Sequence, residues 1–357
     1  MDISEKIRLV KEVGEEIIEE KEMYELFQQK KNPVAYDGFE PSGRIHLAQG
    51  LLRAINVNKL TRVGINFKFW VADWFALMNN KMGGDLDKIQ DVGEYFIEVW
   101  KASGMEMGRV NFLWASEHMN QEYWLRTLQI ARMNSVQRIT RCAQIMGRKE
   151  TDSLSAAQIF YPCMQASDIF QLKADIAQLG MDQRKVNVLA REIAPKLGFK
   201  KPIAVHHHML MGLQPSLNVG GDAIEKAIEM KMSKSHPDSA VFMTDSKEEV
   251  FRKVNKAYCP EGLAENNPML EYCKYILFEL NKEIKIERER KFGGDVVFNG
   301  YSELEKGFAK KEIHPMDLKD AVARHLNKNL EPVRVHFKKN KKLQEMEKRI
   351  LGYEVTR

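Results

Sequence analysis

Short apolar runs alternate with amphipathic stretches between residues 33 and 210, and this alternation restricts the possible folds more than any other feature of the chain. The strand-like runs are PVAYDGF (33–39), INFKFWVADWFA (65–76), VNFLWAS (110–116), ADIAQLG (174–180) and IAVHHHML (203–210), and helical spacing occupies 46–60, 86–104 and 183–197. Strand–helix alternation is typical of parallel sheets that carry helices on both faces. We therefore predict a Rossmann-like α/β domain over residues 1–244, with a mostly helical insertion at about 117–172.

Both ends of the chain are predicted to be helical. Residues 3–31 have helical periodicity, and no strand-like run is recognised after Thr244. KEEVFRKVNKAY, NPMLEYCKYILFEL and MDLKDAVARHLNKNLEPVRVHF all have helical spacing, so we predict a second, all-α domain over residues 245–357.

Composition and charge limit the classes of protein to which this chain can belong. No run reaches the roughly 18 apolar residues of a membrane span, and the charged N-terminus differs from a signal sequence. The net charge is +5, and Glu331 to Arg357 contain eight Lys or Arg against four Asp or Glu, a surplus of four. This basic tail favours a polyanionic partner, although solvated basic C-termini are common. Without CxxC spacing, the cysteines are expected to be reduced thiols of a cytoplasmic protein: Cys142, Cys163, Cys259 and Cys273.

The first strand runs into the turn YDGFEPSGRIHLAQG (36–50), which has the form of a phosphate site. We expect a helix to begin at about Ile45–His46, and a helix N-terminus offers free amides to an anion. His46 would lie in the first helical turn and could donate to the same anion. A sharp strand–helix turn with an incidental histidine is the alternative. The chain has neither a G-x-G-x-x-G nor a Walker sequence.

Two further segments carry polar side chains in unusual positions. In FYPCMQASDIFQL, Pro162 fits the first position of a helix. Tyr161, Gln165 and Asp168 would then share one helical face and could bind a small zwitterion, unless that face is only solvated. Gln183, Arg184 and Lys185 directly follow a predicted strand, at the sheet edge where α/β proteins bind ligands, although a plain helix start is the alternative.

The triplet His206–His207–His208 is not interpreted as a metal site. Consecutive strand residues point to opposite faces, and no carboxylate or cysteine stands at ligand spacing nearby. We expect no structural metal.

KMSKS at 231–235 places two lysines and two serines on a short loop, and here the chain resembles a known family. Together with HLAQ at 46–49, this motif is similar to the signatures of class I aminoacyl-tRNA synthetases. More narrowly, the chain resembles tyrosyl-tRNA synthetases of the archaeal and eukaryotic type. The matching blocks in order are YDGFEPSGRIH, YPCMQASDI, LGMDQRKVNVLARE, KMSKS, FGGD (292–295) and HPMDLK (314–319).

The resemblance implies an ATP-dependent reaction in which L-tyrosine forms tyrosyl-adenylate and is then transferred to its tRNA. ATP would enter as a substrate with Mg²⁺. By resemblance the catalytic residues are His46, Gln49, Lys231 and Lys234. The ATP site adds Gly43, Ala48, Met232 and Ser233. Two positions depart from the family motif, because Ala48 replaces a glycine and Gln49 replaces its second histidine.

The resemblance also assigns tyrosine and tRNA contacts. Tyr36 and Asp168 would bind the substrate phenol, and Tyr161, Gln165 and Gln183 its ammonium group. Arg141 and Arg184 would lie near the acceptor stem, while Phe292, His314 and Asp317 would read the anticodon from the C-terminal domain. A homodimer through the insertion is implied. A tryptophanyl-tRNA synthetase, a nucleotidyltransferase and a catalytically silent RNA-binding derivative remain as alternatives.

Overall fold

The computed structural model describes residues 1–146, 153–214, 230, 232 and 237–353. Its main feature is a six-stranded sheet in the order β1-β6-β5-β2-β3-β4. All neighbouring strands run parallel except β1, which pairs antiparallel with β6. The predicted Rossmann-like architecture is therefore confirmed. The strands are β1 (Glu16–Ile18), β2 (Val34–Phe39), β3 (Asn66–Val71), β4 (Val110–Trp114), β5 (Ile176–Gly180) and β6 (Ile203–His207).

Alternating side chains divide the sheet between two hydrophobic layers. Ala35, Phe69 and Ile176 pack with helices α3 and α5 on one face, whereas Tyr36 and Trp70 pack with α9 and α10 on the other. This division follows from the period of two along a strand. The helices of this part of the chain are α1 (Ile3–Val13), α2 (Glu20–Gln29), α3 (Arg53–Arg62), α4 (Asp73–Met78), α5 (Leu86–Ala102), α6 (Ala115–His118), α7 (Gln121–Arg132), α8 (Val136–Thr140), α9 (Ala156–Gln171) and α10 (Arg184–Ile193).

The helical periodicity predicted over 3–31 holds for α1 and α2, but strand β1 separates the two helices. At Gly14 the chain passes so close to β6 that an added Cβ would lie 2.8 Å from Cγ1 of Val205. The Glu15 amide then donates to the His206 carbonyl at 2.8 Å. The close approach therefore turns the chain onto the edge of the sheet, where three residues are enough to pair.

Two helix starts also differ from the prediction. Helix α9 begins at Ala156, where Ser155 and Gln158 form a reciprocal capping box, so Pro162 lies inside the helix. The capping box satisfies the first free amides of the helix. His46 precedes its helix and forms an isolated antiparallel bridge with Phe242, and a π-helical turn at Ala48–Leu52 leads into α3.

The C-terminal region is mainly helical, as predicted, but the expectation that no strands follow Thr244 was wrong. Strands β7 (Ile284–Ile286) and β8 (Val296–Phe298) form an antiparallel hairpin. Three-residue strands carry too few alternations to be recognised from sequence. The helices are α12 (Lys247–Asn255), α13 (Pro268–Tyr272), α14 (Phe278–Leu280), α15 (Tyr301–Ala309), α16 (Pro315–Lys338) and α17 (Lys341–Gly352).

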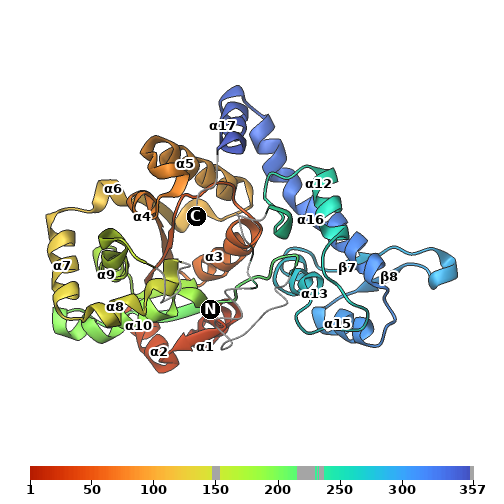
Figure 1. Cartoon of the computed structure of the whole chain (residues 1–357). Coiled ribbons are helices and arrows are strands. Elements are labelled where there is room, and N and C mark those ends of the chain that lie inside the picture. Colours follow the sequence, from red (N-terminus) through yellow and green to blue (C-terminus); the bar gives the residue numbers. More distant parts are fainter. Residues whose placement is uncertain (147–152, 215–229, 231, 233–236, 354–357) are drawn as a thin grey trace.

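Helix α17 returns to the α/β part and lies beside α5 (Figure 1). Arg349 of α17 pairs with Asp91 of α5 at 2.6 Å. The division of the chain at residue 244 stays a prediction. Over the described ranges, no helix combines the length and the apolar composition that crossing a membrane requires.

Candidate active site

A cavity of about 300 Å³ opens at the carboxyl ends of the parallel strands. Phe39, Ala72, Gly180 and His207, at or just beyond the ends of β2, β3, β5 and β6, all line it. In open α/β sheets ligands bind at this edge. The volume suits a ligand of small-molecule size.

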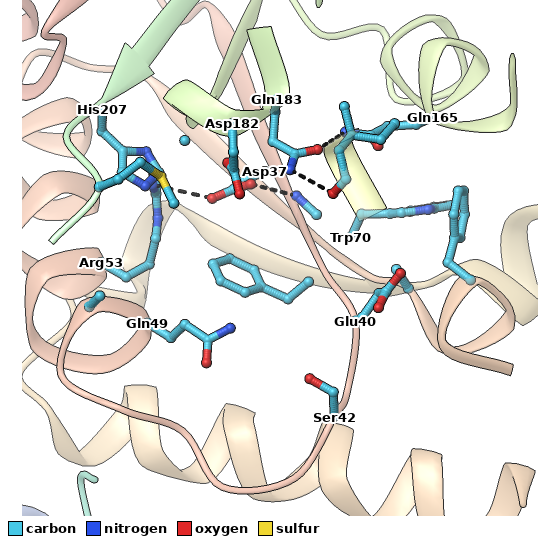
Figure 2. A pocket seen from close by; sticks show the side chains of 18 of the residues that line it. Asp37, Glu40, Ser42, Gln49, Arg53, Trp70, Gln165, Asp182, Gln183 and His207 are labelled. Carbon is cyan, nitrogen blue, oxygen red and sulfur yellow. Dashed lines mark hydrogen bonds and ion pairs between the residues drawn. The ribbon is translucent and has the colours of Figure 1, made fainter. Parts of the chain in front are cut away.

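The five residues predicted to bind tyrosine all line this cavity: Tyr36, Tyr161, Gln165, Asp168 and Gln183. Three of them come from one face of α9, as their spacing predicts. Gln165 and Gln183 point toward each other, and the Gln165 amide donates to Gln183 Oε1 at 2.9 Å (Figure 2). Gln183 in turn donates to the Ile145 carbonyl at 3.1 Å. The amides are therefore held in fixed orientations.

Asp168 and Tyr36 form the buried end of the cavity. Burial raises the pKa of the Asp168 carboxyl, and a 2.8 Å hydrogen bond from the Tyr123 hydroxyl opposes this rise. Burial also raises the pKa of Tyr36, and the charge of Asp168 adds to the effect. The Tyr36 hydroxyl makes no hydrogen bond of standard geometry with a described residue, although Gln165 is close enough to oppose the rise in its pKa. A hydrogen-bonding ligand fits at this end.

A buried polar network at the base of the cavity was not predicted. Arg53, 1% exposed, pairs with Asp37 at 3.2 Å and also contacts Gln178 and His207 Nδ1, the latter at 3.1 Å. Burial raises the pKa of Asp37 to about 7, although the Arg53 charge opposes it. Burial and the Arg53 charge lower the pKa of His207. A neutral His207 can therefore accept at Nδ1.

Further cavity residues escaped the sequence analysis. Glu40 accepts hydrogen bonds from Tyr161 and Asn79, and Ser42 and Asp182 also line the cavity (Figure 2). Glu40 and Ser42 lie within the turn YDGFEPSG, and Asp182 directly precedes Gln183. Their closeness in sequence to residues that were already predicted as site residues is the signal that could have identified them.

The residues predicted to contact ATP are only partly described. His46, Ala48, Gln49 and Met232 line the cavity, and His46 is 8% exposed. Gly43 does not line it, but its φ of +94° explains why the turn has glycine there. Three predicted residues, Lys231, Ser233 and Lys234, lie outside the described residues.

The three consecutive histidines have different partners. His206 contacts Glu16 and Asn187, His207 joins the cavity network, and His208 contacts Glu15 and Glu271. Within the described ranges no group of three or more His, Cys, Asp or Glu side chains is arranged to hold a metal ion.

The residues predicted to contact tRNA lie outside the cavity lining. Arg141 is exposed at the end of α8, and Arg184 begins α10 and pairs with Glu16 at 2.8 Å. In the C-terminal region, Phe292 is 61% exposed. His314 caps α16 by accepting from the Met316 amide at 3.2 Å, and Asp317 lies in the first turn of that helix.

The fold and the cavity define a class of protein that sequence comparison identifies. A family model described as tRNA synthetases class I (W and Y) matches residues 28–331, most of the chain. With the parallel sheet and a cavity at its carboxyl edge, the match places the chain among the class I aminoacyl-tRNA synthetases.

The full-length relatives narrow this class. The chain is 50% identical to tyrosine–tRNA ligase 1, cytoplasmic, of Arabidopsis thaliana over 360 residues, which cover 100% of this chain and 90% of that protein. The structure of tyrosyl-tRNA synthetase from Pyrococcus horikoshii complexed with L-tyrosine matches with a TM-score of 0.91 and 38% identity, over 98% of this chain and 100% of that chain. A Leishmania major tyrosyl-tRNA synthetase in complex with tyrosinol has a TM-score of 0.90 and 43% identity, and the match covers 99% of this chain but only 53% of that one. The chain belongs to the tyrosyl-tRNA synthetases of the archaeal and eukaryotic type.

Proposed function

We propose that this chain attaches L-tyrosine to its tRNA in two steps, through a tyrosyl-adenylate intermediate. Family membership and 50% identity over the whole chain make it a tyrosine–tRNA ligase. The preference for tyrosine is supported by the buried end of the cavity, where one ligand could contact both Tyr36 and Asp168. A phenol can both donate and accept there, whereas a phenyl ring would leave these polar groups without a ligand partner.

Tyrosine binding is assigned to both ends of the cavity. Tyr36 and Asp168 would bind the substrate hydroxyl, and Tyr123 would hold the Asp168 carboxyl in place. Tyr161, Gln165 and Gln183 would hold the ammonium group. Glu40, whose carboxylate accepts from the Tyr161 hydroxyl, would add negative charge near that end. Contacts at both ends would bind the tyrosine zwitterion in one orientation.

In the first step, a tyrosine carboxylate oxygen attacks the α-phosphorus of ATP. The bond from that phosphorus to the bridging oxygen breaks, and pyrophosphate leaves with the electron pair. The protein contributes mainly position and charge. Gly43, Ala48 and Met232 would shape the ATP site, and His46 and Gln49 would contact the phosphates. The assignment of Lys231, Ser233 and Lys234 to the phosphates rests on the KMSKS motif alone.

Mg²⁺ would accompany ATP. The oxygen ligands that this ion prefers are provided largely by phosphates in nucleotide sites. Asp37 is paired with Arg53, Glu40 accepts from Tyr161 and Asn79, and among the described residues no group of three or more His, Cys, Asp or Glu side chains is arranged to hold a metal ion, so the phosphates would supply most of the ligands of the ion. The ion would neutralise phosphate charge when bound.

In the second step, a hydroxyl of the tRNA 3′-terminal adenosine attacks the tyrosyl carbonyl carbon and AMP leaves. Arg141 and Arg184 are proposed to contact the acceptor stem. The exposed ring of Phe292 supports stacking on an unpaired base. His314 and Asp317, at the start of α16, are proposed to bond the edges of anticodon bases.

We also propose a homodimer in the cytoplasm. Helix α7 exposes three large apolar side chains within one turn, since Trp124 is 37%, Leu125 56% and Leu128 55% exposed. A grouped apolar surface of this kind favours a protein interface. The helix belongs to the segment predicted as an insertion. The cytoplasmic location is supported by the name of the Arabidopsis relative.

Amino-acid-dependent exchange of pyrophosphate into ATP, without tRNA, tests the first step. Exchange with tyrosine, and none with tryptophan or phenylalanine, is the expected result. Exchange with tryptophan would overturn the assignment of Tyr36 and Asp168. Folded protein that exchanges with none of the three while binding tRNA would identify a silent RNA-binding derivative.

A further inference from the structure

The segment that follows β6 forms one wall of the active-site cavity and pairs with the chain on either side of Lys231. Met209 and Leu210 line the cavity, as does Met232. The Met232 amide donates to the Leu210 carbonyl at 3.4 Å, and the Gly212 amide donates to the Met230 carbonyl at 2.8 Å. Residues 210–212 therefore fix the positions of residues 230 and 232, of which Met232 lines the cavity.

Helix α13 of the C-terminal region holds the middle residue of this segment by both of its backbone polar groups. The Met211 amide donates to Glu271 Oε2 at 2.8 Å, and the Tyr272 hydroxyl donates to the Met211 carbonyl at 3.0 Å. Met211 is 3% exposed and Tyr272 is fully buried. Because buried backbone groups need partners, these two side chains fix the position of the segment relative to α13.

The other carboxylate oxygen of Glu271 extends the connection. Glu271 Oε1 lies 3.0 Å from Nε2 of His208, whose Nδ1 faces Glu15 of the loop before β1 at 3.3 Å. His208 also stacks on Tyr275 at 4.2 Å between ring centroids. The same carboxylate thus holds both ends of His208–Met211, and Met209 and Leu210 lie between them.

Helix α13 also packs against α16, which begins at Pro315 and is capped by His314. One continuous set of contacts therefore joins the C-terminal region to the backbone that flanks the cavity. Contacts elsewhere between the two regions, such as Lys59 with Glu279 at 2.7 Å, do not involve this segment.

We infer that Glu271 and Tyr272 are positioning residues for adenylate formation, which set the place of residues 210–212, and so of Met230 and Met232, from the C-terminal region. The inference rests on the proposed function. Neither residue lines the cavity. Tyr272 acts through the Met211 peptide, whereas Glu271 acts through that peptide and also through His208, which lines the cavity. They are expected to affect the use of ATP more than the binding of tyrosine, because the tyrosine residues belong to β2, α9 and the start of α10.

The test compares matched variants in tyrosine-dependent pyrophosphate exchange. Tyr272→Phe removes only the hydroxyl on Met211, and Glu271→Gln keeps an acceptor for the Met211 amide but removes the charge facing His208. The controls are Tyr301→Phe, which removes a hydroxyl bonded to Glu305 at 2.8 Å, and Glu279→Gln, which weakens the Lys59 pair. ATP KM, kcat, tyrosine affinity and the melting temperature are measured for each.

We expect Tyr272→Phe to lower kcat/KM for ATP about tenfold, because it leaves a buried carbonyl unpartnered next to the paired segment. Glu271→Ala should have a larger effect than Glu271→Gln. Tyrosine affinity should stay within about twofold of the wild type, since no tyrosine contact is removed. Both controls should keep wild-type ATP kinetics.

Two results would overturn the inference. The first is that Tyr272→Phe has the same ATP kinetics as the control Tyr301→Phe. The second is that Tyr272→Phe lowers tyrosine affinity and the melting temperature as strongly as it lowers kcat/KM for ATP, which would identify a general structural role. Failure of the wild type to exchange pyrophosphate with tyrosine would instead refute the proposed function. The two failures are therefore distinguishable.

Discussion

Tyr36→Phe should stabilise the free protein and weaken its use of tyrosine at the same time. The Tyr36 side chain is fully buried on β2, and its hydroxyl makes no hydrogen bond of standard geometry with a described residue. An unpartnered buried hydroxyl costs about 1–3 kcal/mol, and the nearby Gln165 offsets part of this cost, so removal of the hydroxyl should raise the free energy of unfolding by up to about 1 kcal/mol. The same removal would delete one neutral hydrogen bond to the substrate phenol. A loss of about 0.5–1.5 kcal/mol lowers kcat/KM for tyrosine about 2- to 12-fold.

Urea unfolding of the ligand-free protein and pyrophosphate exchange test the two halves of this prediction. Activity with phenylalanine, where it is measurable, should not fall, because phenylalanine has no hydroxyl for Tyr36 to contact. Tyr95→Phe is the matched control with the opposite expectation. Its buried hydroxyl lies 3.2 Å from Thr244 Oγ1, outside the cavity, so the control should lose stability and keep its tyrosine kinetics. A Tyr36→Phe variant that is less stable than the wild type, or that uses tyrosine equally well, would refute the reasoning.

Three other predictions concern the interface, the pH dependence and the tRNA step. Leu125→Glu should convert the dimer to monomers in sedimentation, while Leu351→Glu, at an equally exposed leucine of α17, should not; a monomeric wild type would contradict this. Burial lowers the pKa of His208, but its hydrogen bonds to Glu15 and Glu271 prevail and raise the pKa to about 9. Since the folded pKa is the higher one, this contribution of about 3 kcal/mol is complete below about pH 6.5 and is lost as the pH rises through 9. The difference in unfolding free energy between wild type and His208→Gln should shrink accordingly, and a constant difference would contradict the assignment. Phe292→Ala should lower aminoacylation about 10-fold or more through lost base stacking and leave pyrophosphate exchange unchanged. The control Val297→Ala, on the same hairpin, should change neither, and an equal fall of both activities in Phe292→Ala would count against anticodon reading.

The sequence was sufficient to predict those site residues that recur at the regular spacing of a helix or a strand. Tyr161, Gln165 and Asp168 could be placed on one helical face by counting, and the structure brings all three to the cavity although α9 begins six residues before Pro162. The face depends only on the helical period, so an error in the helix start did not matter. Strand–helix alternation located the sheet edge in the same way.

Residues that act through tertiary contacts could not be found by counting. Tyr123 reaches Asp168 across 45 positions of sequence, and Arg53 reaches Gln178 across 125. No local pattern distinguishes this Tyr or Arg from others that cover a core or a surface. The strand β1 was missed for a related reason, since its formation depends on the approach of Gly14 to Val205 rather than on its own three residues.

The cavity has a further property that sequence rules do not represent. Several buried polar atoms without hydrogen-bond partners among the described residues gather there, namely Tyr36 Oη, Gln49 Oε1, Arg53 Nε and Trp70 Nε1. Each lowers the stability of the free protein, and stability alone would select apolar groups instead. Their concentration at one site is explained when substrates supply the missing partners. Substrate binding should then stabilise this protein by the binding linkage and also by satisfying these four groups. Asn187 Oδ1 and Arg324 Nη2 also lack hydrogen-bond partners among the described residues but do not line the cavity, so it is the grouping of such atoms, and not a single one, that distinguishes the active site.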